Sequence, residues 1–208
     1  NYALETRDSK GETLYCVLGT WMTDEAGRPR YDRTVMGTVI HEFAHAYVNP
    51  LIEAHRADLR EAGERIFPRV AAAMNAQAYS NWEIMIKESL VRATVVRYLE
   101  GYQGLEAARD EVRDSVDRSF LWLPLLAQLL KAYEYDRESY PVFADYMGAV
   151  IAMFDDYAAN MGTGLARAPS PPRLVSMTPA NGATGVDPAM SKLVFVFDQP
   201  MKAASWSL

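Results

Sequence analysis

The chain has 208 residues, of which 50% are hydrophobic, and a formal net charge of −6. This acidic balance excludes a nucleic-acid-binding protein, because phosphate recognition needs clustered Lys and Arg side chains. No apolar run approaches the ~20 residues of a membrane-spanning helix, so we expect no transmembrane segment. The one cysteine, Cys16, excludes internal disulfides and thiolate-rich metal sites, and we expect it to be a buried, inert thiol.

The pattern of apolar and turn-forming residues predicts a mainly α chain with a small β-element at its N-terminus. Residues 2–23 contain strand-like runs, and residues 24–33 have the composition of a loop. Helices are expected over residues 34–49, 52–67, 69–78, 81–100 and 106–118, followed by two more, of which the last ends near residue 160.

Prolines and one polar residue set the expected helix boundaries. Pro50 and Pro68 are expected to end the helices before them, since proline disfavours helical geometry in the preceding residue. Asn81 is expected to cap the N-terminus of the next helix. Pro124 and Pro141 each fit the first turn of a helix, where a missing N–H costs little.

A change of composition divides the chain into two parts. Residues 162–173 are rich in Gly, Pro, Ser and Ala, which is typical of a linker. We therefore expect an α domain over residues 1–161 and a β segment over residues 174–208. The alternating run Lys192–Asp198 predicts a strand in this second part. Because Asn1 begins directly in patterned sequence, we also expect that an upstream segment was removed.

The segment His41-Glu42-Phe43-Ala44-His45 predicts a metal site. Two histidines at positions i and i+4 project from one face of a helix, so their imidazoles can converge on one ion. Glu42 lies between them, where it can take a proton from a water molecule on that ion. We expect His41 and His45 to bind Zn2+ and Glu42 to act as the catalytic base. The alternative is a core helix with two incidental histidines, which would bury polar groups at a cost.

A catalytic zinc ion usually has three protein ligands and one open position. A third histidine on the same helix would require Gly at 48 and His at 51, but Val48 and Leu51 stand there. His55 lies beyond Pro50, and we expect it to be a solvated or capping residue. Asn49 either hydrogen-bonds near the site or caps the helix, and the cap is preferred. A carboxylate from the helix over residues 81–100 is then the expected third ligand.

Glu88 is the preferred candidate, and Glu83 is the next. Glu83 can form a surface ion pair with Lys87, one turn away. Glu88 instead shares its helix face with apolar residues: Ile84, Met85, Val91 and Val95. A buried acid needs a compensating charge, which a zinc ion supplies. The alternative is a buried ion pair between Glu88 and Arg92. That arginine can instead be a residue that hydrogen-bonds to a metal ligand.

The run His41–Pro50, with Lys87-Glu88-Ser89 and Tyr133–Pro141 downstream, resembles the gluzincin group of zinc metallopeptidases. It is also similar to an uncharacterised bacterial family of secreted or lipid-anchored H-E-x-x-H proteins. The likeness covers most of residues 1–160 and implies a zincin-like α+β domain that cleaves peptide bonds in a peptide or protein substrate. Arg92 stands where the gluzincin pattern has an acid that orients a histidine, so the residues that hydrogen-bond to the metal ligands must differ from those of gluzincins.

The same resemblance implies a hydrogen-bond donor for the oxyanion that forms on a scissile carbonyl. Tyr133 and Tyr140 are the predicted donors, and Tyr135 is a further candidate. For each of them, the alternative is a packed ring with a satisfied hydroxyl.

The C-terminal part resembles the opening strands of a bacterial immunoglobulin-like domain. The likeness rests on the turn-rich run Pro179–Pro188 followed by Phe195–Met201. A complete sandwich of this kind needs ~100 residues, so residues 174–208 are interpreted as its N-terminal fragment. Such modules commonly occur in exported bacterial proteins, and the resemblance therefore implies an extracytoplasmic location: secreted, periplasmic or lipid-anchored.

Three functions are compatible with these features. The leading hypothesis is a zinc metallopeptidase that uses Glu42 as its base. The second is a non-catalytic exported module that keeps zinc for structure and binds a surface polymer through its β part. The third is a zinc-dependent esterase or amidase, which the sequence does not separate from a peptidase.

Overall fold

The computed structural model describes residues 2–8, 11–20, 22–31, 35–161 and 174–197. The chain divides into two compact units, Asn1–Ala168 and Pro169–Leu208. The predicted linker, residues 162–173, lies outside the described residues. The elements in chain order are β1 (Tyr2–Asp8), β2 (Gly11–Val17), α1 (Val35–Ala54), α2 (Arg56–Ala76), α3 (Trp82–Tyr102), α4 (Leu105–Asp117), α5 (Leu123–Tyr135), η1 (Phe143–Tyr146), α6 (Met147–Asn160), β3 (Leu174–Thr178) and β4 (Val194–Phe197).

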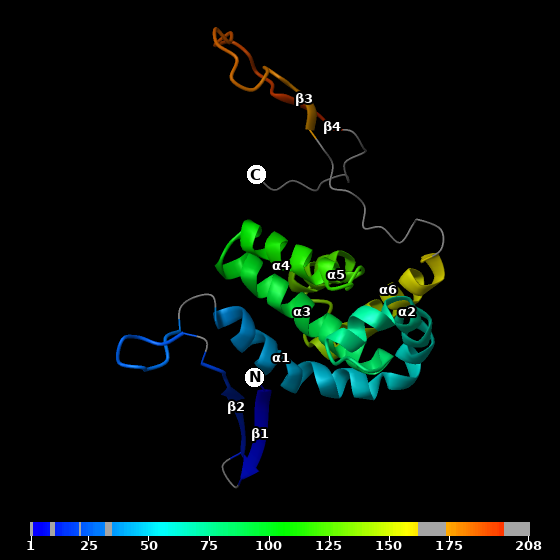
Figure 1. The fold of residues 1–208 in the computed structure, drawn as a ribbon. Helices are drawn as coiled ribbons and strands as arrows, with labels where there is room; N and C mark the ends of the chain where they lie inside the picture. The colour runs from blue at the N-terminus through cyan, green and yellow to red at the C-terminus, as the bar shows by residue number, and fades with distance from the viewer. Residues whose placement is uncertain (1, 9–10, 21, 32–34, 162–173, 198–208) are drawn as a thin grey trace. The chain divides into compact units, whose positions relative to one another are not determined.

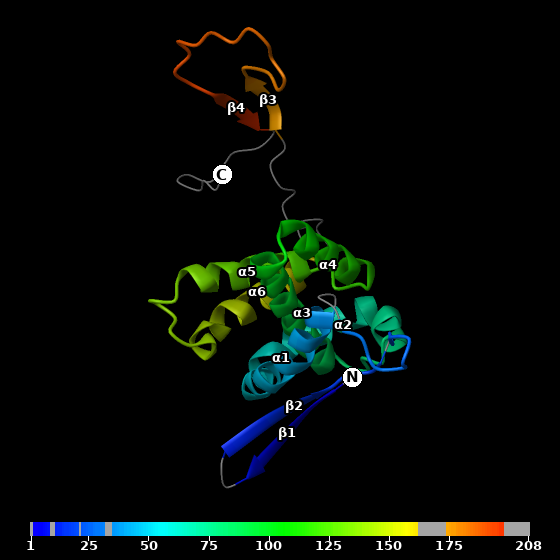
Figure 2. The same ribbon diagram turned by 90° about the vertical axis from the view of Figure 1, so that its left-hand side faces the viewer.

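The predicted fold class, mainly α with small β parts at both ends, is confirmed. The first unit is a helical bundle built around α3, which packs against α1, α2, α4 and α5 (Figures 1 and 2). Helix α6 packs against α2 and α5. The central place of α3 follows from its sequence, since a helix that is apolar on most sides must be covered on most sides. Strands β1 and β2 form an antiparallel hairpin that contacts α1.

The two internal prolines do not end helices, so the predicted boundaries at Pro50 and Pro68 are wrong. Helix α1 continues through Pro50 to Ala54, and α2 runs through Pro68 without a break. A proline inside a helix costs ~3 kcal/mol, because one hydrogen bond is lost and the ring crowds the preceding turn. A fully buried isoleucine lies close to each proline: Ile52 follows Pro50 on α1, and Ile66 precedes Pro68 on α2. Burying such side chains stabilises by ~1.5–3 kcal/mol each, so packing of the whole helix offsets the proline.

Two further boundary predictions are confirmed and one is wrong. The Asn81 side chain caps α3 by accepting a hydrogen bond from the N–H of Ile84 at 2.9 Å. Pro124 lies in the first turn of α5. Pro141, in contrast, precedes the short helix η1, and α6 begins only at Met147. The Pro141 carbonyl accepts a hydrogen bond from the Arg137 side chain at 2.6 Å, which stabilises a bend in place of a helix start.

Gly63 on α2 is a close packing position against α3. A Cβ atom added there would lie 2.7 Å from Cδ2 of Trp82 and would overlap its indole ring. This ring is rigid, and the Arg56 guanidinium lies over it at 5.8 Å. Overpacking costs ~1–3 kcal/mol, while Ala is better than Gly in a helix by ~1 kcal/mol. We therefore expect Gly63→Ala to lower the free energy of unfolding by up to about 2 kcal/mol in a denaturant titration.

Gly101 on α3 is the matched control, because it is also a helical glycine but has open space around the added Cβ atom. Gly101→Ala is expected to leave the free energy of unfolding unchanged or raise it by up to ~1 kcal/mol. Equal responses of the two variants would contradict the close packing of Gly63 against Trp82.

The second unit contains an antiparallel pair of strands, β3 and β4, with an irregular register between Leu174 and Ser176. Strand β4 lies within the predicted strand Lys192–Asp198, of which Asp198 is outside the described residues. Phe195 and Val196 on β4 are exposed, so neither face of this sheet is covered within the described residues. No described helix is both long and apolar enough to span a membrane.

Candidate metal centre

Helix α1 brings His41 and His45 together. Their Nε2 atoms are 3.3 Å apart and their ring centroids 5.0 Å apart, because residues four apart lie on one helix face. The helix is held in place by buried Ala44, Val48 and Ile52 on the side that meets the core. Both histidine side chains remain about one quarter exposed, at 25% and 23%. A ligand from solvent can therefore reach the pair.

Glu88 on α3 completes a cluster with these two histidines. Its Oε1 atom lies 3.3 Å from Nε2 of His45, and its Oε2 atom lies 3.5 Å from Nε2 of His41. Glu88 is 8% exposed and stands among the apolar residues that join α3 to α1. The structure thus brings together the three residues that the sequence predicts as metal ligands.

The spacing of these donor atoms fits a tetrahedral zinc ion. Zinc binds imidazole nitrogen and carboxylate oxygen at ~2.0–2.2 Å, so two ligands at a tetrahedral angle lie about 3.3 Å apart. The two Nε2 atoms are 3.3 Å apart, and each imidazole lies 3.3 or 3.5 Å from one of the two Glu88 oxygens. Among the described His, Cys, Asp and Glu side chains, no fourth joins this group. Three protein donors leave one coordination position open, which is the arrangement of catalytic zinc sites.

The charge state of the cluster also fits a bound cation. Burial, His45 and the Arg92 charge lower the pKa of His41 to about 4. Burial raises the pKa of the Glu88 carboxyl, although His45, Tyr79 and Arg92 oppose that rise. The Oε2 atom of Glu88 is buried without a hydrogen-bond partner. A carboxylate and imidazole lone pairs gathered in this way need a positive charge between them, which a divalent metal ion supplies.

Asn49 lies behind His45, so the preferred prediction that it caps the helix is wrong. Its Oδ1 atom is 3.3 Å from Nδ1 of His45, and α1 extends past it to Ala54. A helix that continues has no end for Asn49 to cap. When Nδ1–H of His45 donates to this amide oxygen, Nε2 keeps its lone pair and faces His41 and Glu88. Asn49 thereby orients the His45 ring.

Glu42 is half-buried on α1 beside the cluster. Its negative charge raises the pKa of Glu88 and also that of the Cys16 thiol on β2, for which burial is the larger cause. The Glu42 charge therefore acts on both the candidate metal centre and the hairpin. Cys16 itself is half-buried, not fully buried as predicted, because the hairpin packs against α1 from one side only.

The predicted tyrosines belong to an aromatic cluster between the end of α5 and η1. The Tyr133 ring packs on Phe143 and Tyr146 at centroid distances of 5.0 and 5.3 Å. Tyr140 contacts Tyr146 at 4.8 Å, and Tyr135 is 81% exposed. None of these ring contacts involves His41, His45 or Glu88. The role of Tyr133 and Tyr140 as oxyanion donors stays a prediction.

The two alternative ligands lie outside the cluster. Glu83 forms the predicted surface ion pair with Lys87 at 3.2 Å, and a second one with Arg56 at 2.6 Å. These partners lower the pKa of Glu83, with Arg56 as the largest cause. His55 occupies the N-cap position of α2, where its Nδ1 atom is 3.2 Å from Asp58. Both residues are accounted for by surface interactions.

Tyr79 is a site residue that the sequence does not reveal. It lies in the turn between α2 and α3, where its hydroxyl accepts a hydrogen bond from Arg92 at 3.5 Å, and burial together with the Glu88 charge raises its pKa. Burial raises the pKa of Glu88, and Tyr79 is among the residues that oppose this rise. A residue outside every periodic segment gives no spacing signal, so only the folded chain shows that Tyr79 lies beside Glu88.

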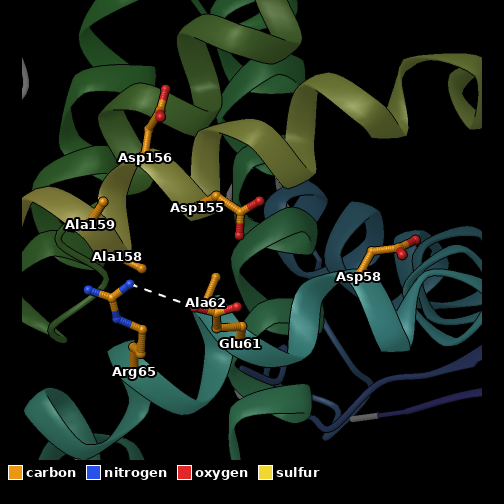
Figure 3. A pocket seen from close by; sticks show the side chains of 8 residues that line it. All are labelled: Asp58, Glu61, Ala62, Arg65, Asp155, Asp156, Ala158 and Ala159. Carbon is orange, nitrogen blue, oxygen red and sulfur yellow. Dashed lines mark ion pairs between the residues drawn. The ribbon is translucent and has the colours of Figure 1, made fainter.

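A separate pocket of about 350 Å3 lies between α2 and α6 (Figure 3). Its lining is mostly charged, with Asp58, Glu61 and Arg65 from α2 and Asp155 and Asp156 from α6. Figure 3 shows Arg65 paired with Glu61. His41, His45 and Glu88 do not line this pocket, so it is distinct from the candidate metal centre.

Comparisons with known proteins identify two domains. Residues 29–153 match a domain of unknown function, DUF4932, and residues 168–208 match a bacterial Ig-like domain. The second match confirms the predicted Ig-like part and begins within the predicted linker. No curated protein and no solved structure matches the chain. Since the first match covers more than half of its residues, the chain belongs to the DUF4932 family, with a bacterial Ig-like segment after that domain.

Proposed function

We propose that this chain is a zinc-dependent hydrolase, and that it acts as a metallopeptidase. The observation that carries the proposal is the cluster of His41, His45 and Glu88: the two Nε2 atoms are 3.3 Å apart, and Glu88 oxygens lie 3.3 and 3.5 Å from them. His41 and His45 would bind the ion through Nε2, and Glu88 through its carboxylate. Zinc in such a site lowers the pKa of a water molecule to ~7 and polarises a carbonyl group.

Glu42 is the proposed general base. Its carboxylate takes a proton from the attacking water and can return that proton to the leaving amine. Two features support this role: Glu42 directly follows His41 on α1, and it is not one of the three donor residues. An acid in this place that is not a ligand is free to accept a proton.

The open coordination position favours catalysis over a structural role for the metal. A structural zinc site is closed by four protein ligands, whereas the described donors number three. The choice of a peptide bond rests on the gluzincin resemblance of residues 41–50. The Ig-like segment supports the further proposal that the enzyme works outside the cytoplasm, since such modules commonly occur in exported bacterial proteins.

Metal analysis combined with substrate panels tests the proposal. Purified protein is expected to hold about one zinc per chain and to hydrolyse unfolded casein or a mixed peptide library. A chelator should abolish hydrolysis, and added zinc should restore it. Retained zinc without turnover of any peptide would contradict the peptidase. Turnover of ester or amide substrates alone would favour an esterase or amidase, and a fully coordinated, inert zinc would favour the non-catalytic module.

A further inference from the structure

Asn49 on α1 lies on the face of the helix that carries His41 and His45. These three residues follow one another at intervals of four, so their side chains form one row along the helix. Nδ1 of His45 lies 3.3 Å from Oδ1 of Asn49, and Nε2 of the same ring lies 3.3 Å from Nε2 of His41. That Nε2 atom is also 3.3 Å from Oε1 of Glu88. Each nitrogen of the His45 ring thus has its own neighbour: Asn49 at one edge and the candidate metal centre at the other.

The chemistry of the amide fixes the position of the proton on this ring. The Oδ1 atom of Asn49 carries no hydrogen, so it can only accept. The contact is therefore a hydrogen bond only when Nδ1 of His45 carries the proton and donates it. A neutral imidazole has one N–H, so Nε2 then holds the lone pair. Of the two neutral tautomers, the one that Asn49 selects directs its lone pair at His41 and Glu88.

The backbone that carries Asn49 is held by its neighbours on α1. Val48 is 5% exposed and Ile52 is fully buried, and both belong to the hydrophobic core. The helix continues through Pro50 to Ala54, so Asn49 has helical backbone on both sides. Its own side chain is half-buried. The amide is therefore carried by the same continuous, core-packed helix as the two histidines.

The local sequence does not favour asparagine at this position of a helix. Asparagine is a poorer helix former than alanine, because its side chain competes for backbone hydrogen bonds. The residue before a proline is also disfavoured in helical geometry, and Asn49 precedes Pro50. Helix formation alone would thus be better served by alanine. The contact with His45 gives this side chain a role that alanine cannot fill.

We propose that Asn49 is a positioning residue of the metal centre: its amide oxygen holds the His45 ring by Nδ1–H and so directs the Nε2 lone pair at the metal ion. The proposal rests on the proposed function only in requiring that the cluster binds a metal ion. Groups that hydrogen-bond to a metal-binding histidine fix its tautomer and ring orientation, and losing one typically weakens metal affinity ~10–100-fold. A side-chain pair at i and i+4 contributes little to helix stability. Metal binding and folding should therefore respond differently when the amide is removed.

The test compares cobalt binding by wild-type protein, Asn49→Ala and Asn49→Asp. Metal-free protein is titrated with Co2+ in the presence of a competing chelator, and visible absorption reports both affinity and ligand geometry. For Asn49→Ala we expect a ~10–100-fold lower affinity and an altered cobalt spectrum. Its metal-free form should melt no lower than wild type, because alanine is the better helix former. Asn49→Asp keeps an oxygen that accepts from Nδ1–H, so it should bind cobalt at least as tightly as wild type, with a similar spectrum.

Asn75→Ala is the matched control. Asn75 also lies in a helix, α2, but its side chain is exposed and it is outside the candidate metal centre. This variant makes the same chemical change, so its cobalt affinity and spectrum should equal those of wild type.

The outcomes separate this proposal from the proposed function. Weaker cobalt binding by Asn49→Ala that is restored in Asn49→Asp supports the positioning role. Equal affinities and spectra for wild type and Asn49→Ala would overturn that role alone, as would an Asn49→Asp protein that binds as weakly as Asn49→Ala. A metal-free Asn49→Ala protein that melts well below wild type would assign the amide to folding instead. A wild-type protein that takes up no cobalt would overturn the metal centre, and the proposal with it.

Discussion

Replacing Glu42 by glutamine is expected to abolish hydrolysis while the protein keeps its zinc. Glutamine has the size of glutamate but cannot accept a proton, and loss of a general base lowers the rate by ~10²–10⁴-fold. Zinc binding should persist, because Glu42 is not among the three clustered donors. The expected result is a fall in kcat/KM with about one zinc per chain still present. Kinetics and metal analysis on the same preparation measure both quantities.

Glu53→Gln is the matched control for this experiment. Glu53 lies on the same helix, α1, but its side chain is exposed and pairs with Lys87 at 2.8 Å. An exposed ion pair contributes little to stability, so this variant should keep both hydrolysis and zinc. A Glu42→Gln protein with wild-type kcat/KM would exclude Glu42 as the base. A Glu42→Gln protein that loses its zinc would assign Glu42 to metal binding instead.

Short-range signals in the sequence predict the helices well, and long-range packing explains the errors. The Asn81 cap is confirmed because its side chain acts on a backbone N–H only three residues away. Pro50 and Pro68, in contrast, do not end their helices, for a reason that is not local to the sequence. Their local cost is real, but burial of Ile52 and Ile66 in the common core outweighs it. That burial depends on helices far apart in the sequence, which the sequence pattern does not place.

For the candidate site too, local sequence signals predict one part, and long-range packing determines the rest. The spacing of His41 and His45 is a property of one helix, and the apolar face around Glu88 is a property of another, so the sequence predicts all three as ligands. The structure brings them together through the packing of α1 on α3. The prediction that Asn49 caps the helix depends on a helix end at Pro50, which the structure does not have. Tyr79 lies in a turn, where no periodicity indicates which side chain faces Glu88.

Replacing Glu88 by glutamine is expected to remove the stabilisation that zinc gives the protein. Zinc at a hundredfold excess over its Kd stabilises a native protein by ~2.7 kcal/mol, and a neutral amide oxygen is a poor substitute for a carboxylate ligand. Wild type should therefore melt at a higher temperature with zinc than without it, and Glu88→Gln should melt at nearly the same temperature in both conditions. Thermal unfolding of the metal-free and zinc-loaded proteins gives this comparison.

Without metal, the stability difference between wild type and Glu88→Gln should have the opposite sign. Folding raises the pKa of Glu88 because the carboxyl is buried. The folded state then binds more protons than the unfolded state, so this group makes folding less favourable as the pH rises above the ordinary glutamate value. An amide has no charge to bury, and metal-free Glu88→Gln should be at least as stable as wild type at neutral pH. The ranking of the two proteins is thus expected to reverse when zinc is added.

Glu83→Gln provides the control, since it makes the same chemical change on the same helix outside the metal cluster. Glu83 pairs with Arg56 and Lys87 at the surface, so its loss should lower stability slightly and leave the zinc-induced rise in melting temperature intact. If Glu88→Gln and Glu83→Gln gave the same zinc response, Glu88 would not be a ligand. Because both variants exchange one carboxylate for one amide on α3, a difference between their zinc-induced rises in melting temperature indicates coordination of the metal by Glu88.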